Sequence, residues 1–213
     1  MNQTSNSCPN FSMRLETAFV LVHKAIDAVK EKSIQKRNLI WLELTGCSGN
    51  IISLLDGSNP DFKSLANQMI NFIYDNSLMA AEGEAAMEKL FGIIGGDYIL
   101  AVEGAVSMKD NGLYNIIGKR RGRSVTAYEA IKKFGEQAAY VIAVGTCASD
   151  GGISAARPNP AECVGIQSLL NRKVIKLPGW ISYPDWQIGK LSYVMVMDEP
   201  ELVPSQRLLM FYS

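Results

Sequence analysis

Short apolar runs alternate with longer amphipathic stretches along most of this chain. Four of the runs are rich in valine and isoleucine, and each leads into a loop that contains glycine; they are NLIWLEL (38–44), DYILAVEG (97–104), AYVIAVGT (139–146) and RKVIKLPG (172–179). Runs of this kind are typical of strands that a parallel sheet buries on both faces. We therefore predict four parallel strands.

The stretches between these runs carry apolar residues at helical spacing. They are DFKSLANQMINFI (61–73), SLMAAEGEAAMEKLFGII (77–94), TAYEAIKKFGEQ (126–137) and AECVGIQSLLN (161–171). Strands that alternate with helices in this way predict an α/β fold, with helices on both faces of a doubly wound parallel sheet.

A further amphipathic helix is expected before the first strand. Apolar residues recur at helical spacing between Met13 and Lys32, at Leu15, Phe19, Val22, Ile26 and Val29. The predicted organisation is a disordered tail over 1–12, an N-terminal helix extension over 13–36, an α/β domain over 37–198 and a C-terminal segment over 199–213.

Composition and charge limit the classes of function that the chain can have. The chain has 21 basic and 21 acidic residues, so its formal net charge of zero gives no indication of nucleic-acid binding. No apolar run approaches the roughly 18 residues of a membrane span, and no secretory leader precedes the first helix, so we expect a cytoplasmic protein. The four cysteines form no Cys-x-x-Cys pair, which in a reducing compartment favours metal binding or inert thiols over disulfides.

Chemically active residues follow three of the predicted strands. Cys47 lies in the loop after the first strand, Glu103 closes the second, and Cys147 lies in GTCASDGG after the third. The carboxyl ends of parallel strands share one edge of a sheet, where ligands bind, so we expect these residues to meet there. Two thiols on loops at one edge indicate a shared metal centre; the alternative is that both are small apolar fillers. The glycines around Cys147 favour the metal centre, because they let backbone N–H groups approach a sulfur ligand.

Six segments in consecutive order resemble the small subunit of [NiFe] hydrogenases, in particular its N-terminal, flavodoxin-like domain. They are WLELTGCSGNIISLL, SLMAAEGEAA, VEGAV, VIAVGTCASDGGISAARPNP, LPGWISYPDW and PELVPSQRLLMFYS. The resemblance implies that the domain at 37–198 holds a proximal iron–sulfur cluster, [4Fe–4S] or [3Fe–4S], while a separate large subunit carries the Ni–Fe centre. The chain would then be a non-catalytic, electron-transfer subunit of an oxidoreductase that acts on H₂.

The resemblance also implies a ligand set, from which this chain departs. Cys47 and Cys147 match two of the family's four cysteine ligands, whereas Asn50 and Trp180 stand at the other two positions. An indole has only an N–H donor and cannot ligate iron.

Three interpretations stay open. In the first, Cys163 supplies a third thiolate, helped by an oxygen ligand from Asn50, Asp150 or Glu162. In the second, another chain completes the cluster, or Cys8 does. In the third, no cluster binds, and the chain is a structural or regulatory subunit that stabilises the large subunit. The predicted cofactor-binding residues are Cys47, Cys147, Cys163 and Asn50, with the three cysteines as metal ligands.

The C-terminal segment PELVPSQRLLMFYS indicates which partners to expect. Family members continue past it into a domain for further clusters, whereas this sequence ends at Ser213. The resemblance therefore implies two partners, the large subunit and a further electron-transfer subunit. The N-terminal helix is expected to dock by laying its apolar face in a partner's groove.

Overall fold

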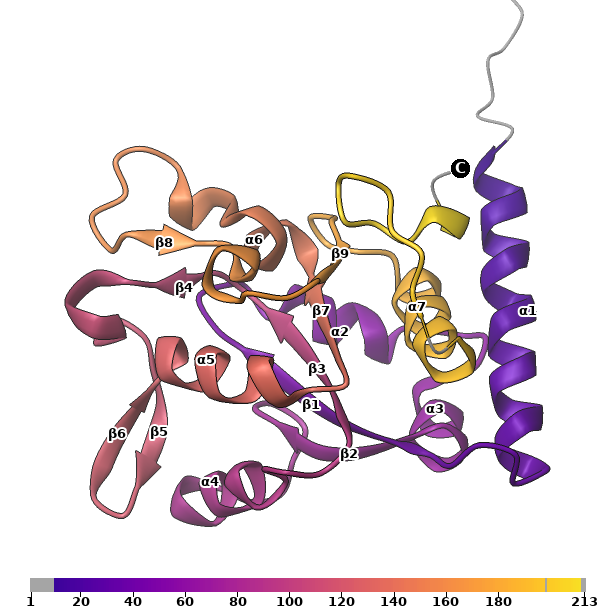
Figure 1. Cartoon of the computed structure of the whole chain (residues 1–213), viewed down its shortest axis with the longest axis horizontal. Helices are drawn as coiled ribbons and strands as arrows, with labels where there is room; N and C mark the ends of the chain where they lie inside the picture. Colours follow the sequence, from indigo (N-terminus) through magenta and orange to yellow (C-terminus); the bar gives the residue numbers. More distant parts are fainter. Residues whose placement is uncertain (1–9, 198, 212–213) are drawn as a thin grey trace, which may run out of the picture.

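A five-stranded, all-parallel sheet forms the centre of the molecule (Figure 1). The structure is a computed structural model and describes residues 10–197 and 199–211. The strands are β1 (Arg37–Glu43), β2 (Ile70–Asp75), β3 (Tyr98–Glu103), β7 (Tyr140–Val144) and β9 (Ile175–Leu177), in the spatial order β2-β1-β3-β7-β9. Counted along the chain this is the order 2-1-3-4-5, which is that of flavodoxin-like doubly wound sheets. The predicted fold class is confirmed.

Helices cover both faces of this sheet (Figure 1). On one face lie α2 (Gly49–Leu55), α3 (Phe62–Gln68) and α7 (Pro184–Val196), with α1 (Asn10–Lys30) packed against α7. On the other face lie α4 (Gly83–Gly92) and α5 (Ala127–Gln137). The short helix α6 (Gly145–Asp150) follows β7 directly, at the carboxyl edge of the sheet.

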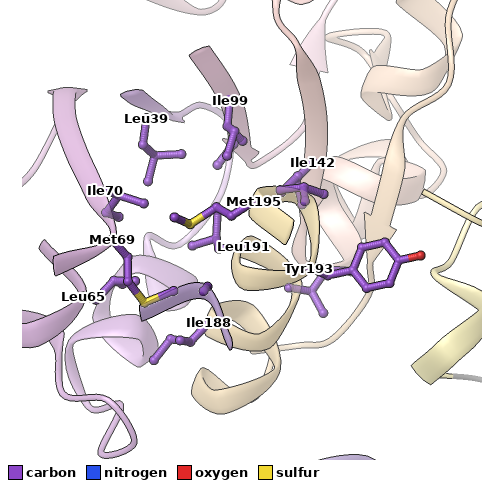
Figure 2. Close-up of a cluster of buried hydrophobic side chains, with 14 of the residues drawn as sticks. Leu39, Leu65, Met69, Ile70, Ile99, Ile142, Ile188, Leu191, Tyr193 and Met195 are labelled. Carbon is purple, nitrogen blue, oxygen red and sulfur yellow. The ribbon is translucent and has the colours of Figure 1, made fainter. Parts of the chain in front are cut away.

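The two hydrophobic clusters share the central strands between them. In β1, Leu39 joins the cluster beneath α7, whereas its neighbour Ile40 joins the cluster beneath α4 and α5. Figure 2 shows the first cluster, in which side chains from neighbouring strands, such as Leu39 and Ile99, lie over Leu191 of α7. Because both faces are buried, every position of a strand can be apolar, which explains the continuous runs in the sequence.

Small elements surround the core. They are the antiparallel pair β4 (Val106–Ser107) and β8 (Cys163–Val164), the hairpin β5 (Ile116–Arg120) and β6 (Arg123–Thr126), and the 3-10 turns η1 (Lys109–Gly112), η2 (Gly152–Ala155), η3 (Ile166–Leu169) and η4 (Leu209–Phe211).

The N-terminal helix belongs to the core of this chain. Ala18, Leu21 and Val22 are buried in the cluster that also contains α7, so the apolar face that we expected to dock into a partner is already covered. The tail predicted over 1–12 falls mostly outside the described residues, and α1 begins at Asn10. Within the described ranges, no helix has both the length and the apolar character needed to cross a membrane.

Two of the predicted helices are partly or wholly wrong. The helix predicted over 61–73 ends at Gln68, and Ile70–Asp75 forms the edge strand β2, which the sequence pattern did not separate from the helix. The helix predicted over 161–171 is replaced by β8 and η3. There the side chain of Asn159 bonds to both backbone groups of Cys163, accepting from its N–H at 2.8 Å and donating to its carbonyl at 3.0 Å. This clamp holds the backbone extended, and a local side-chain bond of this kind competes with a helix.

Candidate metal centre at the carboxyl edge of the sheet

A cavity of about 250 Å³ lies at the carboxyl edge of the sheet, and two cysteines line it. Cys47 and Cys147 contribute to its wall together with Asn50, Trp180 and Ile181. The cavity sits where the chain leaves β1 and β7, beside the point at which the strand order reverses. This is the position where doubly wound sheets bind ligands.

Cys47 is exposed and lies on the loop between β1 and α2. The start of this loop is fixed, because Thr45 and Ala105 exchange two backbone hydrogen bonds of 3.1 and 2.8 Å. Gly49 follows two residues after the thiol, and a Cβ there would lie 3.1 Å from the Cys47 sulfur. A glycine at this position leaves the sulfur open to the cavity.

Cys147 lies in α6 and is half-buried. Burial raises the pKa of its thiol, and the neighbouring Cys47 and Glu103 raise it further, while a hydrogen bond from the backbone N–H of Ile153 acts in the opposite direction. At Gly152 a Cβ would lie only 2.6 Å from the Cys147 sulfur. The backbone therefore closes around this sulfur and donates an N–H to it, as it does around metal-bound thiolates.

Glu103 is a buried acceptor for the first turn of α2. It is 2% exposed. Its Oε1 accepts from the backbone N–H of Asn50 at 2.7 Å, and its Oε2 accepts from the backbone N–H of Ile51 at 3.0 Å. These N–H groups at the start of a helix have no partner within the helix, so a carboxylate there satisfies them. Glu103 thus anchors α2, and with it the loop that carries Cys47.

The side-chain oxygen of Asn50 is already engaged by hydrogen bonds within the chain. It accepts two hydrogen bonds from Ser182, from the backbone N–H at 2.9 Å and from the hydroxyl at 2.8 Å. An amide oxygen has two lone pairs, and Ser182 uses both. Asn50 therefore lines the cavity, but its oxygen is not available as a ligand in this arrangement.

Trp180 stands at the mouth of the cavity and is 68% exposed. Its neighbours on the protein surface are also apolar. A groove of about 570 Å³ beside the cavity is lined by Ile52, Leu55, Ile181 and Tyr183, each of which is exposed. The mouth of the cavity thus opens onto an apolar surface, which we call the rim: Ile52, Leu55, Trp180, Ile181 and Tyr183.

The structure does not bring Cys163 into a group with the other two thiols. Cys163 lies on β8 opposite Ser107 of β4 and is 4% exposed. Burial alone raises the pKa of its thiol, whereas that of Cys147 also responds to Cys47. In the part of the chain that the structure describes, no three His, Cys, Asp or Glu side chains form a group that could hold a metal ion.

The other candidate ligands are engaged elsewhere or not described. Asp150 pairs with Lys176 at 2.7 Å, and Glu162 lies 3.8 Å from Lys109. Cys8 lies outside the described residues.

The residues of the cavity fit a metal centre held by thiolates, with two ligands from the described residues. Two thiols line one cavity, and a glycine lies close to each sulfur, where a Cβ would crowd it. Sulfur ligands suit iron–sulfur clusters and zinc. The same residues do not fit a cluster held by four cysteines of the described chain, because neither Asn50 nor Trp180 offers a ligand.

Two further buried carboxylates, which were not predicted from the sequence, lie near this edge. Glu43 ends β1 and is 9% exposed, while Asp75 ends β2 and is 1% exposed. Burial and, to a lesser extent, the charges of Glu43 and Glu103 raise the pKa of Asp75 to about 6, against the hydrogen bonds from two backbone N–H groups. An acidic residue at the end of an apolar run, as in INFIYD, was the sequence feature that could have indicated these carboxylates.

Comparisons with known proteins agree on one family. Residues 47–194 match the family described as NADH ubiquinone oxidoreductase, 20 Kd subunit. The small subunit of the periplasmic [NiFeSe] hydrogenase of Desulfomicrobium baculatum is 30% identical over 91% of this chain and 68% of its own length. The uptake hydrogenase small subunit of Azotobacter vinelandii is 34% identical over 82% of this chain, which spans 49% of that protein.

A solved structure gives the same result in three dimensions. The reduced, active [NiFeSe] hydrogenase of Desulfomicrobium baculatum contains a chain that superposes with a TM-score of 0.76 at 29% identity, covering 83% of this chain and 70% of that one. Several of the hydrogenase small subunits are about twice as long as the segment matched here, since the matched part is 47–49% of their length.

Proposed function

The chain belongs to the family of the NADH ubiquinone oxidoreductase 20 kDa subunit, among the hydrogenase small subunits, and on this basis we propose that it is the electron-transfer small subunit of a [NiFe]-hydrogenase-type complex. In this proposal the chain is a non-catalytic part of an enzyme acting on H₂, and a partner large subunit carries the Ni–Fe centre. The observation that supports it most directly is the cavity with Cys47 and Cys147 at the strand-order reversal.

We propose that this cavity holds an atypical proximal iron–sulfur cluster, [4Fe–4S] or [3Fe–4S]. Cys47 and Cys147 would bind it, and the remaining ligands would come from outside the described residues. Such a cluster supplies one-electron chemistry when it is bound. The chain's own contribution is to present two sulfurs, donate the Ile153 N–H to one of them and surround them with an apolar rim.

The rim supports docking of the large subunit at the mouth of the cavity. Its residues are exposed by 42–68%, and they gather beside the two thiols rather than being scattered singly over the surface. Exposed apolar groups that adjoin one another mark interaction sites. A partner seated on the rim would exclude water from the cavity and bring its own redox centre close to the two thiols. A further electron-transfer subunit and a cytoplasmic location stay predictions.

The alternative is a structural or regulatory subunit without a cluster. One observation favours it: the described residues offer two thiols and no third ligand at the cavity. In that case the chain would still dock through the rim and stabilise the large subunit.

Iron and acid-labile sulfide, measured per chain on the anaerobically purified complex together with low-temperature EPR, separate the two functions. We expect three or four iron atoms per chain with matching sulfide, and a spectrum that tells a three-iron from a four-iron cluster. Iron near zero on this chain, with the large subunit still bound, would establish the structural subunit.

A further inference from the structure

Asn50 contacts several of the elements that surround the thiol cavity. It is 6% exposed and lies three residues after Cys47, in the first turn of α2. Its side-chain Nδ2–H donates to Oε1 of Glu103 at 3.0 Å, which ties α2 to the end of β3. Its side-chain oxygen accepts from Ser182 twice, which ties α2 to the loop that carries Trp180.

The same side chain also rests on the element that carries the second thiol. Gly145 is the first residue of α6, two residues before Cys147, and a Cβ there would lie 2.5 Å from the Asn50 Nδ2. The amide is therefore in close contact with the backbone of α6. In addition, Gln187 of α7 donates to the backbone carbonyl of Asn50 at 3.1 Å and to the hydroxyl of Ser182 at 2.9 Å.

We propose that Asn50 is the positioning residue of this site: it sets the spacing of Cys47 and Cys147 and is not itself a ligand of what they bind. This inference rests on the proposed metal centre and adds a role that thiol chemistry alone does not assign. The two sulfurs lie on elements that are far apart in the sequence, so only contacts between those elements fix their distance. Beyond the pairing of β1 and β7 with β3, Asn50 adds such contacts, because its amide meets α6, β3 and the Ser182 loop at once.

The identity of the residue follows from its partners. The acceptor Glu103 requires a donor, and the two Ser182 donors require an acceptor. A carboxamide has one of each on a short side chain, whereas an aspartate would turn an oxygen toward Glu103. The removal of groups that orient metal ligands typically lowers metal affinity about 10- to 100-fold.

The test uses the metal-free full-length chain under anaerobic conditions, titrated with Cd²⁺ and followed by the thiolate-to-cadmium charge-transfer band. We expect the wild type to bind Cd²⁺ through Cys47 and Cys147, and Asn50→Ala to bind it about 10- to 100-fold more weakly. Asn50→Asp separates positioning from ligation. A carboxylate ligand would hold or raise the affinity, whereas a positioning role predicts that the affinity falls, because the donor to Glu103 is lost.

Two further variants, Ser182→Ala and Ser192→Ala, serve as a milder change at the site and as a matched control. Ser182→Ala removes one of the two bonds to the Asn50 oxygen and should weaken Cd²⁺ binding by a smaller factor than Asn50→Ala. Ser192→Ala removes an equally buried hydroxyl, which donates only within α7 to Ile188 at 2.8 Å, and should leave binding unchanged. Wild-type affinity in Asn50→Ala, or an unchanged or higher affinity in Asn50→Asp, would overturn the inference.

Chemical cross-linking of the two thiols tests the spacing of Cys47 and Cys147 in the absence of metal. A short bifunctional thiol reagent should join Cys47 to Cys147 faster in the wild type and Ser192→Ala than in Asn50→Ala. If the wild type binds no Cd²⁺, the proposed metal centre fails, and the cross-linking rates still decide whether Asn50 positions the thiols. Equal cross-linking rates in all variants would contradict a positioning role for Asn50, whether or not the wild type binds Cd²⁺.

Discussion

A side chain at Gly152 would place its Cβ 2.6 Å from the sulfur of Cys147, closer than real Cβ atoms approach other atoms. Gly152 also has a φ of +54°, which L-residues with a Cβ rarely adopt. Glycine is thus required there for two separate reasons. The positive φ would strain the backbone of any other residue, whereas the close contact would displace the Cys147 sulfur that lines the cavity.

We predict that Gly152→Ala displaces the Cys147 sulfur and lowers bound iron and sulfide, with a Cd²⁺ affinity reduced about tenfold or more. Gly83→Ala is the matched control, since Gly83 has a φ of +55° but no atom lies within 4 Å of a Cβ there. The control should lose about 1–2 kcal/mol of stability from backbone strain and keep its metal content. A similar loss of metal in both variants would show that strain, and not contact with the sulfur, is responsible.

The three described cysteines should differ in their effect on iron content. Cys47→Ser and Cys147→Ser should each remove most of the iron and sulfide, because both thiols line the cavity. Cys163→Ser should leave the iron content unchanged and reduce stability by about 1–3 kcal/mol, because it places a hydroxyl at a buried position. Iron analysis and thermal unfolding of the three variants test this. Loss of iron in Cys163→Ser would instead identify Cys163 as a third ligand.

The sequence was sufficient to predict the centre of the sheet and the position of the cavity. Val- and Ile-rich runs became β1, β3, β7 and β9, because strands buried on both faces leave a continuous apolar signal. Cys47 and Cys147 then met at one edge because parallel strands end together. These inferences needed only local pattern and topology.

The parts that were missed depend on contacts between distant residues. Asn50 and Ser182 are 132 positions apart, so nothing near Asn50 in the sequence shows that its oxygen is already bonded. β2 follows α3 almost directly, and a short apolar run such as INFIYD fits a buried helix and a strand equally well. Cys163 was expected at the edge because it follows the ARPNP segment, whereas the structure holds it in β8 through the Asn159 clamp.

Asp75 should give the stability of the protein a specific dependence on pH. Its pKa is raised from 3.8 to about 6 in the fold, chiefly by burial, so folding favours the protonated acid. The stabilising contribution of this group is complete below pH 3.8 and is lost as the pH rises through about 6.

Asp75→Asn removes the charge and keeps an oxygen for the N–H groups of Ser77 and Leu78, each of which donates to Asp75 at 2.8 Å. The variant should therefore match the wild type at low pH and exceed its stability by about 1–2 kcal/mol at pH 7, after allowance for solvent screening. Urea unfolding of both proteins at several pH values between these limits measures the difference. A difference that does not change with pH would mean that folding leaves the pKa of Asp75 unchanged.

The rim is expected to contact the large subunit, so a substitution there should change binding of this partner. Ile52 is 62% exposed and lines the groove beside the thiol cavity. If the large subunit covers this surface, Ile52→Asp buries a charge in an apolar contact and should weaken the complex by about 2 kcal/mol or more, which is roughly 30-fold in affinity. Affinity purification of a co-expressed hydrogenase large subunit, followed by measurement of its dissociation constant, reads this directly.

Val20→Asp is the matched control, because Val20 is 53% exposed on α1 and lines neither the groove nor the thiol cavity. It introduces the same charge at a similarly exposed apolar residue and should leave the complex intact. Weakening by Val20→Asp alone would move the docking surface to the N-terminal helix and leave the rim without its partner. Weakening by Ile52→Asp alone, with iron content unchanged, would place the large subunit over the mouth of the cavity, where a redox centre has the shortest path to the two thiols.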